Sequence, residues 1–260
     1  MQEALSSSGL EPREARLLLA VATGFSEASV IASSDRVSDE AEKRFAGFVA
    51  RRKTGEPVAY ILGRKEFYGL ELAVNPAVLI PRPETELLVD LSLEKGFESA
   101  VDLGTGSGAI ALALKTHRPQ ARVVAVEWSA AALVVAKRNA VKHSLEVEFR
   151  HGRWLEGMEE SFDLIVSNPP YVASGDPHLP DLRFEPAAAL VSGADGLDAI
   201  RELARSAPAH LAAGGWLLLE HGMGQDRAVR ALLSAAGLEE VTSWPDLAGI
   251  PRVSGGKRKI

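Results

Sequence analysis

The chain has 260 residues, 46% of them hydrophobic and 25% charged, a composition typical of a folded globular protein with room for two unequal domains. It contains no cysteine, which excludes disulfides and thiolate chemistry and is compatible with a reducing compartment. The N-terminus lacks the features of a secretory signal, and no apolar run approaches the roughly 18 residues of a membrane span. We therefore expect a cytoplasmic protein without a membrane partner.

The charge balance argues against a protein that grips nucleic acid by general electrostatics. There are 29 basic and 35 acidic residues, so the formal net charge is −6, and phosphate backbones are bound mainly by Lys and Arg. The strongest basic run, Arg51-Arg52-Lys53, comes at the end of a helical pattern just before Gly55, where cations stabilise the helix dipole. We interpret this run as a helix end, and the terminal Gly255 to Ile260 as a solvated tail.

Residues 1–63 predict a small domain of short helices. Leu17 to Leu19 follow Pro12 at a plausible helix start, and Phe45, Phe48 and Val49 recur at helical spacing after Ser38. A Gly- and Pro-rich stretch then runs from Gly55 to Pro76. Apolar residues alternate within it, which predicts a β-hairpin linker over residues 64–83.

Residues 84–260 predict an α/β domain in which helices and strands alternate. Apolar strands are expected at 100–103, 123–126, 147–150, 162–166 and 216–219, with two more around Val241 and Val253. Helices are expected at 85–94, 109–117, 130–141, 197–211 and 227–236. Short, continuously apolar strands between helices indicate a mostly parallel sheet that is covered on both faces. Such sheets bind ligands beyond the carboxyl ends of their strands.

A glycine loop, Gly104-Thr105-Gly106-Ser107-Gly108, follows the first of these strands. Glycines there allow a tight turn and let backbone N–H groups approach a ligand at the helix start. With Ala109 the loop also fits the dinucleotide fingerprint, so a nicotinamide oxidoreductase stays an alternative. The acid before the loop, Asp102, would repel a pyrophosphate but helps to hold an amino-bearing ligand such as S-adenosylmethionine. Glu127, at the end of the next strand, is placed to accept hydrogen bonds from ribose hydroxyls of either cofactor.

The second motif, Asn168-Pro169-Pro170-Tyr171, ends the strand at 162–166. The Asn168 side-chain oxygen and the Pro169 carbonyl are able to accept both hydrogens of a planar NH2 group, which orients its nitrogen and stabilises positive charge during methyl attack. The proline pair stiffens the loop, and Tyr171 offers a flat face to a planar group. The motif therefore predicts methylation of an amide or exocyclic amine nitrogen.

The chemistry of this motif does not by itself choose the substrate. A protein side-chain amide and the N6 amine of adenine in DNA or RNA both fit, although the second needs a basic groove and a target-recognition region that the sequence does not display. A non-enzymatic scaffold would leave the two facing motifs without a purpose. The six histidines show no metal-ligand spacing, so no metal is expected.

With both motifs in place, the chain resembles the release-factor glutamine methyltransferases, the PrmC/HemK family, over nearly its whole length. The matching segments are Arg51-Arg52, Gly55 to Gly63, Leu79 to Glu86, Asp102 to Gly108, Asn168 to Tyr171, Phe184-Glu185-Pro186, Asp195 to Asp198, Gln225, Asp246-Leu247 and Arg252-Val253.

This resemblance implies a class I methyltransferase with a seven-stranded, Rossmann-like sheet in residues 84–260. Its helical N-terminal domain would help to recognise the substrate. The implied reaction is transfer of methyl from S-adenosyl-L-methionine to the side-chain N5 of the glutamine in the Gly-Gly-Gln motif of bacterial class 1 peptide-chain release factors. The implied partner is thus a protein, with no direct nucleic-acid contact, and we expect a monomer.

The resemblance also assigns roles to particular residues. Gly104 to Gly108 and Glu127 would bind the cofactor, and Trp154 would pack near its adenine. Asn168 to Tyr171 would take the glutamine amide, with Asn168 also touching the cofactor. The family commonly has Asp in place of Glu127, Gly-Asp-Trp in place of the segment Gly152-Arg153-Trp154, and Glu-Ile-Gly in place of the segment that begins at Glu220.

Overall fold

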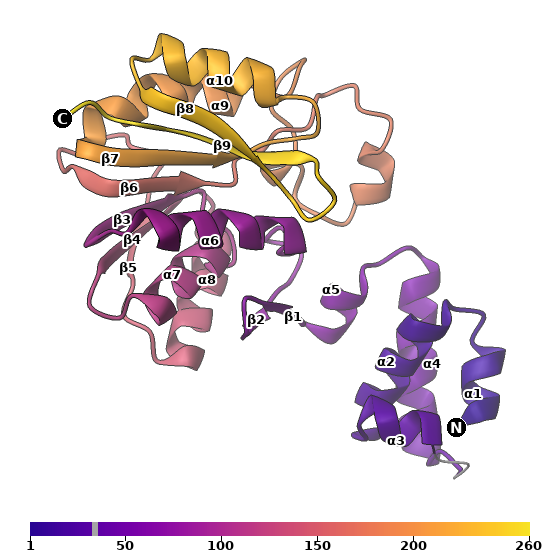
Figure 1. Ribbon diagram of the computed structural model, residues 1–260. Coiled ribbons are helices and arrows are strands. Elements are labelled where there is room, and N and C mark those ends of the chain that lie inside the picture. The colour runs from indigo at the N-terminus through magenta and orange to yellow at the C-terminus, as the bar shows by residue number, and fades with distance from the viewer. Residues whose placement is uncertain (33–35) are drawn as a thin grey trace. The chain divides into compact units, whose positions relative to one another are not determined.

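The computed structural model describes residues 1–32 and 36–260. The chain divides into two compact units, Met1–Arg64 and Lys65–Ile260, of which the first is helical and the second α/β (Figure 1). The expected fold class, an α/β sheet preceded by a small helical part, is confirmed. No helix in the described ranges is long and apolar enough to cross a membrane.

The first unit packs its helices around one small apolar core. The helices are α1 (Gln2–Ser7), α2 (Pro12–Thr23), α3 (Glu27–Ala32), α4 (Asp39–Lys53) and α5 (Val58–Leu62). Leu18, Leu19 and Phe45 are among the buried residues of this core. The segment of α5 lies at the end of the range predicted to be helical, where that range overlaps the breaker-rich stretch from Gly55 to Pro76. The helix breakers Pro57 and Gly63 lie outside α5, because Pro57 precedes the helix and Gly63 ends it at φ +69°.

The basic run at the end of α4 is engaged within the first unit. Arg51 forms an ion pair with Glu56 at 2.5 Å, and Arg52 forms one with Glu14 at 2.8 Å. Since α4 ends at Lys53, the three cations also occupy the end of the helix that favours positive charge. These contacts agree with the helix-end interpretation of the run.

The second unit is built on a seven-stranded sheet in the order β5-β4-β3-β6-β7-β9-β8. Its strands are β3 (Ser99–Leu103), β4 (Arg122–Glu127), β5 (Glu148–His151), β6 (Phe162–Ser167), β7 (Leu211–Glu220), β8 (Glu239–Pro245) and β9 (Pro251–Lys257). The five strands from β5 to β7 are parallel, and β9 is antiparallel to both of its neighbours. A separate hairpin of β1 (Arg64–Phe67) and β2 (Leu70–Ala73) precedes the sheet.

Helices cover both faces of this sheet (Figure 1). One face carries α6 (Glu86–Lys95), α7 (Ala109–His117) and α8 (Ala130–His143), and the other carries α9 (Asp198–Ser206) and α10 (Asp226–Ala235). The 3-10 turns are η1 (Pro83–Thr85), η2 (Leu179–Leu182), η3 (Ala187–Ala189) and η4 (Ala207–His210). The helix expected over 197–211 thus ends early, because Pro208 cannot donate the backbone hydrogen bond that would continue it.

The C-terminal segment is a strand of the sheet, so the expected solvated tail is wrong for residues 255–257. In β9, Gly255 pairs with Leu218 and Gly256 with Leu217 of β7. A Cβ atom at Gly255 would lie 2.5 Å from the Leu218 side chain, so the close approach of the strands requires glycine. The strand expected around Val253 is thus confirmed, but it extends further than the pattern predicted, because glycine has little strand propensity.

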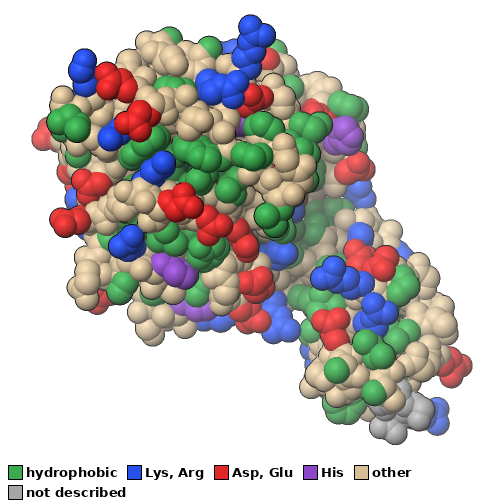
Figure 2. Space-filling view, viewed as in Figure 1, with side chains coloured by type: hydrophobic (Ala, Val, Ile, Leu, Met, Phe, Trp, Pro, Cys, Tyr) green, Lys and Arg blue, Asp and Glu red, His purple; other side chains and the backbone are tan. Residues whose placement is uncertain are grey.

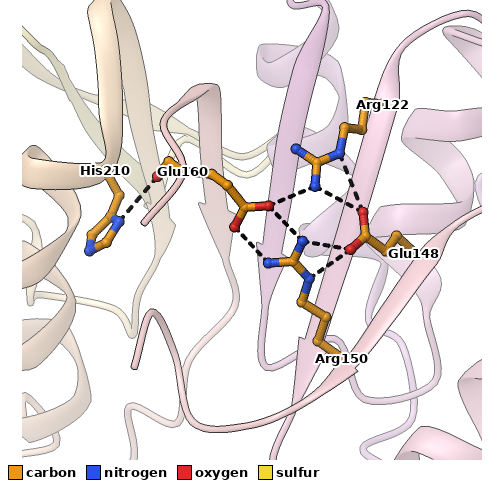
Figure 3. Close-up of polar contacts among 5 residues, drawn as sticks. All are labelled: Arg122, Glu148, Arg150, Glu160 and His210. Atoms are coloured by element: carbon orange, nitrogen blue, oxygen red, sulfur yellow. Dashed lines mark hydrogen bonds and ion pairs between the residues drawn. The ribbon is translucent and has the colours of Figure 1, made fainter. Parts of the chain in front are cut away.

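Four charged side chains form an ion cluster at the amino ends of the strands (Figure 3). Arg122 and Arg150 each pair with both Glu148 and Glu160, at 2.5 to 2.9 Å, and His210 contacts the Glu160 carbonyl. The two guanidinium groups hold the pKa of Glu160 down at about 2. Its contribution to stability is therefore present above its ordinary pKa and is lost as pH falls toward 2. All four side chains are partly exposed, so the cluster stabilises the fold only modestly.

Asn139 of α8 connects the β1–β2 hairpin to the loop after β3. It is fully buried; its Oδ1 accepts the N–H of Ala73 at 2.7 Å, and its Nδ2 donates to the carbonyls of Ala73 and Ser107 at 3.0 and 2.9 Å. One amide therefore satisfies backbone groups from two segments that are far apart in the sequence.

We predict that Asn139→Ala lowers the free energy of unfolding by about 2 to 4 kcal/mol, because buried backbone groups lose their partners. Urea unfolding measures this change. The control is Asn75→Ala, which removes one hydrogen bond, to the N–H of Ala77 in an exposed turn, and is expected to cost under about 1 kcal/mol. Equal losses in the two variants would contradict the connecting role of Asn139.

Candidate functional site

The parallel register brings the ends of four strands to one edge of the sheet. Asp102 of β3 lies opposite Ala125 of β4 and Val166 of β6. Ser167 lies opposite Leu219 of β7. The glycine loop, Glu127, Asn168 and Glu220 all follow or end these strands, so they gather at the carboxyl edge.

Glu127 holds the glycine loop in place. Its buried carboxylate accepts the N–H of Gly106 through Oε2 and the N–H of Ser129 through Oε1, both at 2.9 Å. The N–H groups of Gly104 and Thr105 donate to the Val126 carbonyl just before it. The loop is thus fastened to the end of β4 from two sides.

Asp102 lies behind the glycine loop and is fully buried. Its Oδ2 accepts the Thr105 hydroxyl at 2.6 Å and the Ala111 N–H at 3.2 Å, whereas its Oδ1 has no hydrogen-bond partner. Burial is the main reason that the pKa of Asp102 rises to about 7.

A cavity of about 380 Å³ opens in front of the loop. Six residues that the sequence predicted for the site line it: Gly104, Gly106, Glu127, Trp154, Asn168 and Pro170. The other predicted residues lie around it without lining it: Thr105, Ser107, Gly108 and Pro169 are buried, and Tyr171 is half-buried.

Trp154 lines both this cavity and a second hollow of about 470 Å³. The indole ring lies across Gly104, where a Cβ atom would come within 3.1 Å of it at a backbone φ of +74°. Its Nε1 is buried and has no hydrogen-bond partner. At the rim of the second hollow, Arg153 pairs with Glu202 of α9 at 2.5 Å. Arg153, which stands where the family commonly has Asp, is therefore paired with a carboxylate on α9.

The sequence did not predict the rest of the cavity lining. Its residues are Ala77, Val78, Leu79, Trp128, Ser129, Ala132, Pro186, Ala188 and Ala189. Buried Glu185 connects two parts of this lining, since it accepts the Ile80 N–H at 3.0 Å and pairs with Arg82. The available signals were the position of Trp128 directly after Glu127 and the two matching segments that contain Arg82 and Glu185.

Asn168 is held in one orientation by Thr85. Its Nδ2 donates to the Thr85 hydroxyl at 3.1 Å, and Thr85 is buried. The amide oxygen, Oδ1, consequently points away from Thr85 and stays available as an acceptor. Asn168 is therefore prepared to receive a hydrogen-bond donor on the side of the cavity.

Tyr171 is fixed at both its hydroxyl and its backbone. The hydroxyl donates to Glu220 at 3.3 Å, and Nε2 of Gln225 donates to the Tyr171 carbonyl at 3.0 Å. Burial and the neighbouring Glu220 raise the pKa of Tyr171, so the phenol stays protonated. A Cβ atom at Gly196 would lie 2.1 Å from the Tyr171 carbonyl, which shows how closely the following loop covers this residue.

The site consists of hydrogen-bond acceptors arranged around a cavity. No group of three or more His, Cys, Asp or Glu in the described part of the chain is placed to bind a metal. A larger hollow of about 910 Å³ lies near the amino ends of β4 and β5, among residues such as Lys115 and Lys137. It is away from both motifs and does not belong to this site.

The sheet, the fastened glycine loop and the Asn-Pro-Pro-Tyr segment define a seven-stranded α/β methyltransferase. Residues 83–181 match the family model for the methyltransferase small domain, and residues 1–63 match that for the PrmC N-terminal domain. The chain belongs to the release factor glutamine methyltransferase family, so the family resemblance seen in the sequence is confirmed.

Similar proteins support this membership over almost the full length. The release factor glutamine methyltransferase of Xylella fastidiosa is 54% identical over 225 residues, which are 84% of this chain and 82% of that protein. The protein of the same name from Burkholderia pseudomallei is 48% identical over 98% of this chain and 95% of its own. Among solved structures, a methyltransferase from Pyrococcus furiosus has a TM-score of 0.59 at 20% identity, covering 83% of this chain and all of that one.

The buried Asp102 predicts a specific pH dependence of stability. Its folded pKa, about 7, lies above the ordinary value, so stability is full at low pH and falls as pH rises through 7. Between pH 6 and pH 8.5 the loss from this group is on the order of 1 kcal/mol. Asp102→Asn stays neutral, so its thermal unfolding midpoint should fall less over this range. The same slope in both proteins would contradict a raised pKa of Asp102.

Proposed function

We propose that this chain transfers a methyl group from S-adenosyl-L-methionine to the side-chain N5 of the glutamine in the Gly-Gly-Gln motif of bacterial peptide-chain release factors. The observation that supports this proposal most directly is the orientation of the Asn168 side-chain amide. Its NH2 group is held by Thr85 while its oxygen is available at the cavity that the glycine loop lines. The names of the relatives, at 48 and 54% identity, support the choice of a release-factor glutamine.

The residues around the cavity fit this cofactor. Glu127 lies on its wall, and the N–H groups of Gly106 and Ser129 hold its two oxygens in a fixed position, where they would accept hydrogen bonds from ribose hydroxyls. Buried Asp102 Oδ1 lacks a partner behind the loop, as does Nε1 of Trp154 beside it, and unpaired buried polar atoms are typical of ligand sites. We assign Gly104 to Gly108, Glu127, Trp154 and Asn168 to cofactor binding.

When bound, S-adenosylmethionine supplies a methyl group on a positively charged sulfur. The residues of this chain then have to position a poor nucleophile, because the lone pair of an amide nitrogen is delocalised. Asn168 Oδ1 and the Pro169 carbonyl accept the two amide hydrogens, which fixes the nitrogen and stabilises positive charge on it. The proline pair keeps these acceptors rigid, and Tyr171 completes the substrate side.

The N-terminal unit has a separate role in this proposal. Residues 1–63 would contact the release factor, and residues 64–83 would connect them to the catalytic domain at 84–260. A release factor is a translation protein, so the reaction would take place in the cytoplasm, with the enzyme acting as a monomer.

The second candidate is methylation of adenine N6 in DNA or RNA, which uses the same amide chemistry. The surface charge argues against it. Figure 2 shows Lys and Arg side chains scattered among Asp and Glu over the visible face of the second unit, and the formal charge is −6. A nucleic-acid groove would concentrate positive charge on one surface.

The proposed substrate predicts which molecule receives the labelled methyl group. With labelled S-adenosylmethionine, wild-type release factor should incorporate methyl, and a release factor whose Gly-Gly-Gln is changed to Gly-Gly-Ala should not. Equal labelling of both release factors, or labelling of added RNA or DNA, would contradict the assignment.

The role of Asn168 predicts a loss of turnover. Asn168→Ala should lower kcat by about 100-fold or more, the usual effect of removing one preorganised group that stabilises developing charge. Calorimetry should find its affinity for S-adenosylmethionine within a few fold of wild type, since the other lining residues remain. Full turnover in this variant would refute the role.

A further inference from the structure

Gln225 is the N-cap residue of α10, directly after the turn that follows β7. The proposed function gives it no role. Its backbone is fixed at this position, because its N–H donates to the Gly222 carbonyl at 3.2 Å and its carbonyl accepts the Val229 N–H at 2.9 Å. The side chain therefore extends from a rigid helix start, and it reaches the segment that contains Tyr171.

The Gln225 amide binds the backbone of three segments. Its Oε1 accepts the Gly222 N–H at 2.8 Å, and its Nε2 donates to the carbonyls of Tyr171 at 3.0 Å and Asp195 at 3.3 Å. These partners determine the orientation of the amide, since a backbone N–H only donates and a carbonyl only accepts. One planar group thus joins the turn after β7, the end of the Asn-Pro-Pro-Tyr segment and the loop before α9.

Few side chains are able to make these contacts. The three partners need one acceptor and two donors on the same group. An amide provides both, whereas a carboxylate only accepts, Lys and Arg only donate, and a hydroxyl has a single proton. The contacts therefore specify an amide side chain, and both hydrogens of its NH2 group are used.

Two glycines leave room for the Gln225 amide. A Cβ atom at Gly196 would lie 2.8 Å from Gln225 Nε2, in addition to its clash with the Tyr171 carbonyl, and one at Gly222 would lie 3.1 Å from Gln225 Oε1. A side chain at position 196 would push the amide or the Tyr171 backbone out of place. The backbone around the amide is therefore shaped to hold it.

The residue after the motif is also paired with the loop before α9. The Val172 N–H donates to the Leu190 carbonyl at 2.8 Å, and the Ser192 N–H donates to the Val172 carbonyl at 2.9 Å. This loop continues to Asp195, where Gln225 binds it again. The amide thus connects the motif and the loop together to the start of α10.

The Asn-Pro-Pro-Tyr segment consequently runs between two fixed ends. At its start, the Ser167 hydroxyl donates to the Leu103 carbonyl of β3 at 2.6 Å. At its end, Gln225 holds the Tyr171 carbonyl. The two prolines between these ends have fixed φ angles, so the position of the Tyr171 carbonyl affects that of the Pro169 carbonyl.

We propose that Gln225 is a positioning residue whose amide holds the end of the Asn-Pro-Pro-Tyr segment, so that the Pro169 carbonyl and the Asn168 side chain face the substrate nitrogen. This inference rests on the proposed function and adds a residue outside the motif to the substrate side of the site. Gln225 lines neither the cavity nor the hollow beside it. It therefore acts through Tyr171 and not by touching the cofactor.

Gln225→Glu removes the two donors without changing the size of the side chain. A charged carboxylate keeps an acceptor for the Gly222 N–H but faces the carbonyls of Tyr171 and Asp195 with negative charge. We expect kcat at pH 8 to fall by about tenfold or more, because small displacements of positioning groups are costly. The affinity for S-adenosylmethionine, measured by calorimetry, should stay within about threefold of wild type, since the residues that line the cavity are unchanged.

The pH dependence of Gln225→Glu tests the role of the donors directly. A carboxyl group that faces two carbonyls has a raised pKa, and its protonated form offers one O–H in place of the lost NH2. The ratio of kcat in Gln225→Glu to kcat in wild type should therefore rise as pH falls from about 8 to about 5.5. The ratio at each pH removes the pH dependence of the wild type itself.

Hydrogen exchange tests the same inference without substrate. Gln225→Met removes all three hydrogen bonds and keeps a side chain of similar length. Followed by mass spectrometry, backbone exchange should become about tenfold faster in peptides that cover residues 171–174. It should stay within about twofold in peptides that cover the glycine loop at 104–108. This contrast separates a local loss of positioning from general destabilisation of the fold.

The control is Gln120→Glu, which makes the same change at an exposed position before β4 and should keep wild-type kcat at every pH. Wild-type kcat in Gln225→Glu, or a kcat ratio that does not rise as pH falls, overturns the inference. Unchanged exchange at 171–174 in Gln225→Met also overturns it. An inactive wild type would instead reject the proposed function, and the exchange rates would still decide whether Gln225 holds the segment.

Discussion

The parallel register of β3, β4, β6 and β7 is the constraint on which the site depends. Because neighbouring parallel strands end at one edge, residues separated by up to about 120 positions in the sequence meet there. Glu127 and Glu220 end their strands, Asn168 follows one, and Asp102 is the last residue but one of β3. A slip of one residue in any strand would turn these side chains to the other face of the sheet.

Two of these four residues line the ligand cavity, and the other two support the loop and the segment in front of them. Glu127 and Asn168 line the cavity, whereas Asp102 and Glu220 are buried behind the two motifs. The supporting pair hold the structures in front of them through hydroxyl groups: Thr105 for Asp102 and Tyr171 for Glu220. Burial raises the pKa of both acids to about 7. The site therefore combines rigid positioning with carboxyl groups that change charge near neutral pH, at a cost in stability above it.

The sequence correctly predicted the features of the fold and the site that depend on short-range patterns. Apolar strands between helices gave the sheet, and the two motifs gave the edge at which the site lies. It predicted a strand around Val253 but not its continuation through Gly255 and Gly256, since these glycines allow close packing against β7 and have little strand propensity. The part of the cavity lining that contains Val78 and Pro186, and the hydrogen bond from Asn168 to Thr85, were also missed. Both depend on contacts between segments about 50 to 110 residues apart, which no local pattern reports.

The most direct measurement is a crystal structure of the full chain with S-adenosylhomocysteine and a release factor bearing Gly-Gly-Gln. The account predicts that the glutamine amide nitrogen lies within hydrogen-bond distance of both Asn168 Oδ1 and the Pro169 carbonyl, with Asn168 Nδ2 still on Thr85. The ribose hydroxyls should contact Glu127. A glutamine amide bound away from Asn168, or an Asn168 amide that presents its NH2 group to the substrate, would contradict it.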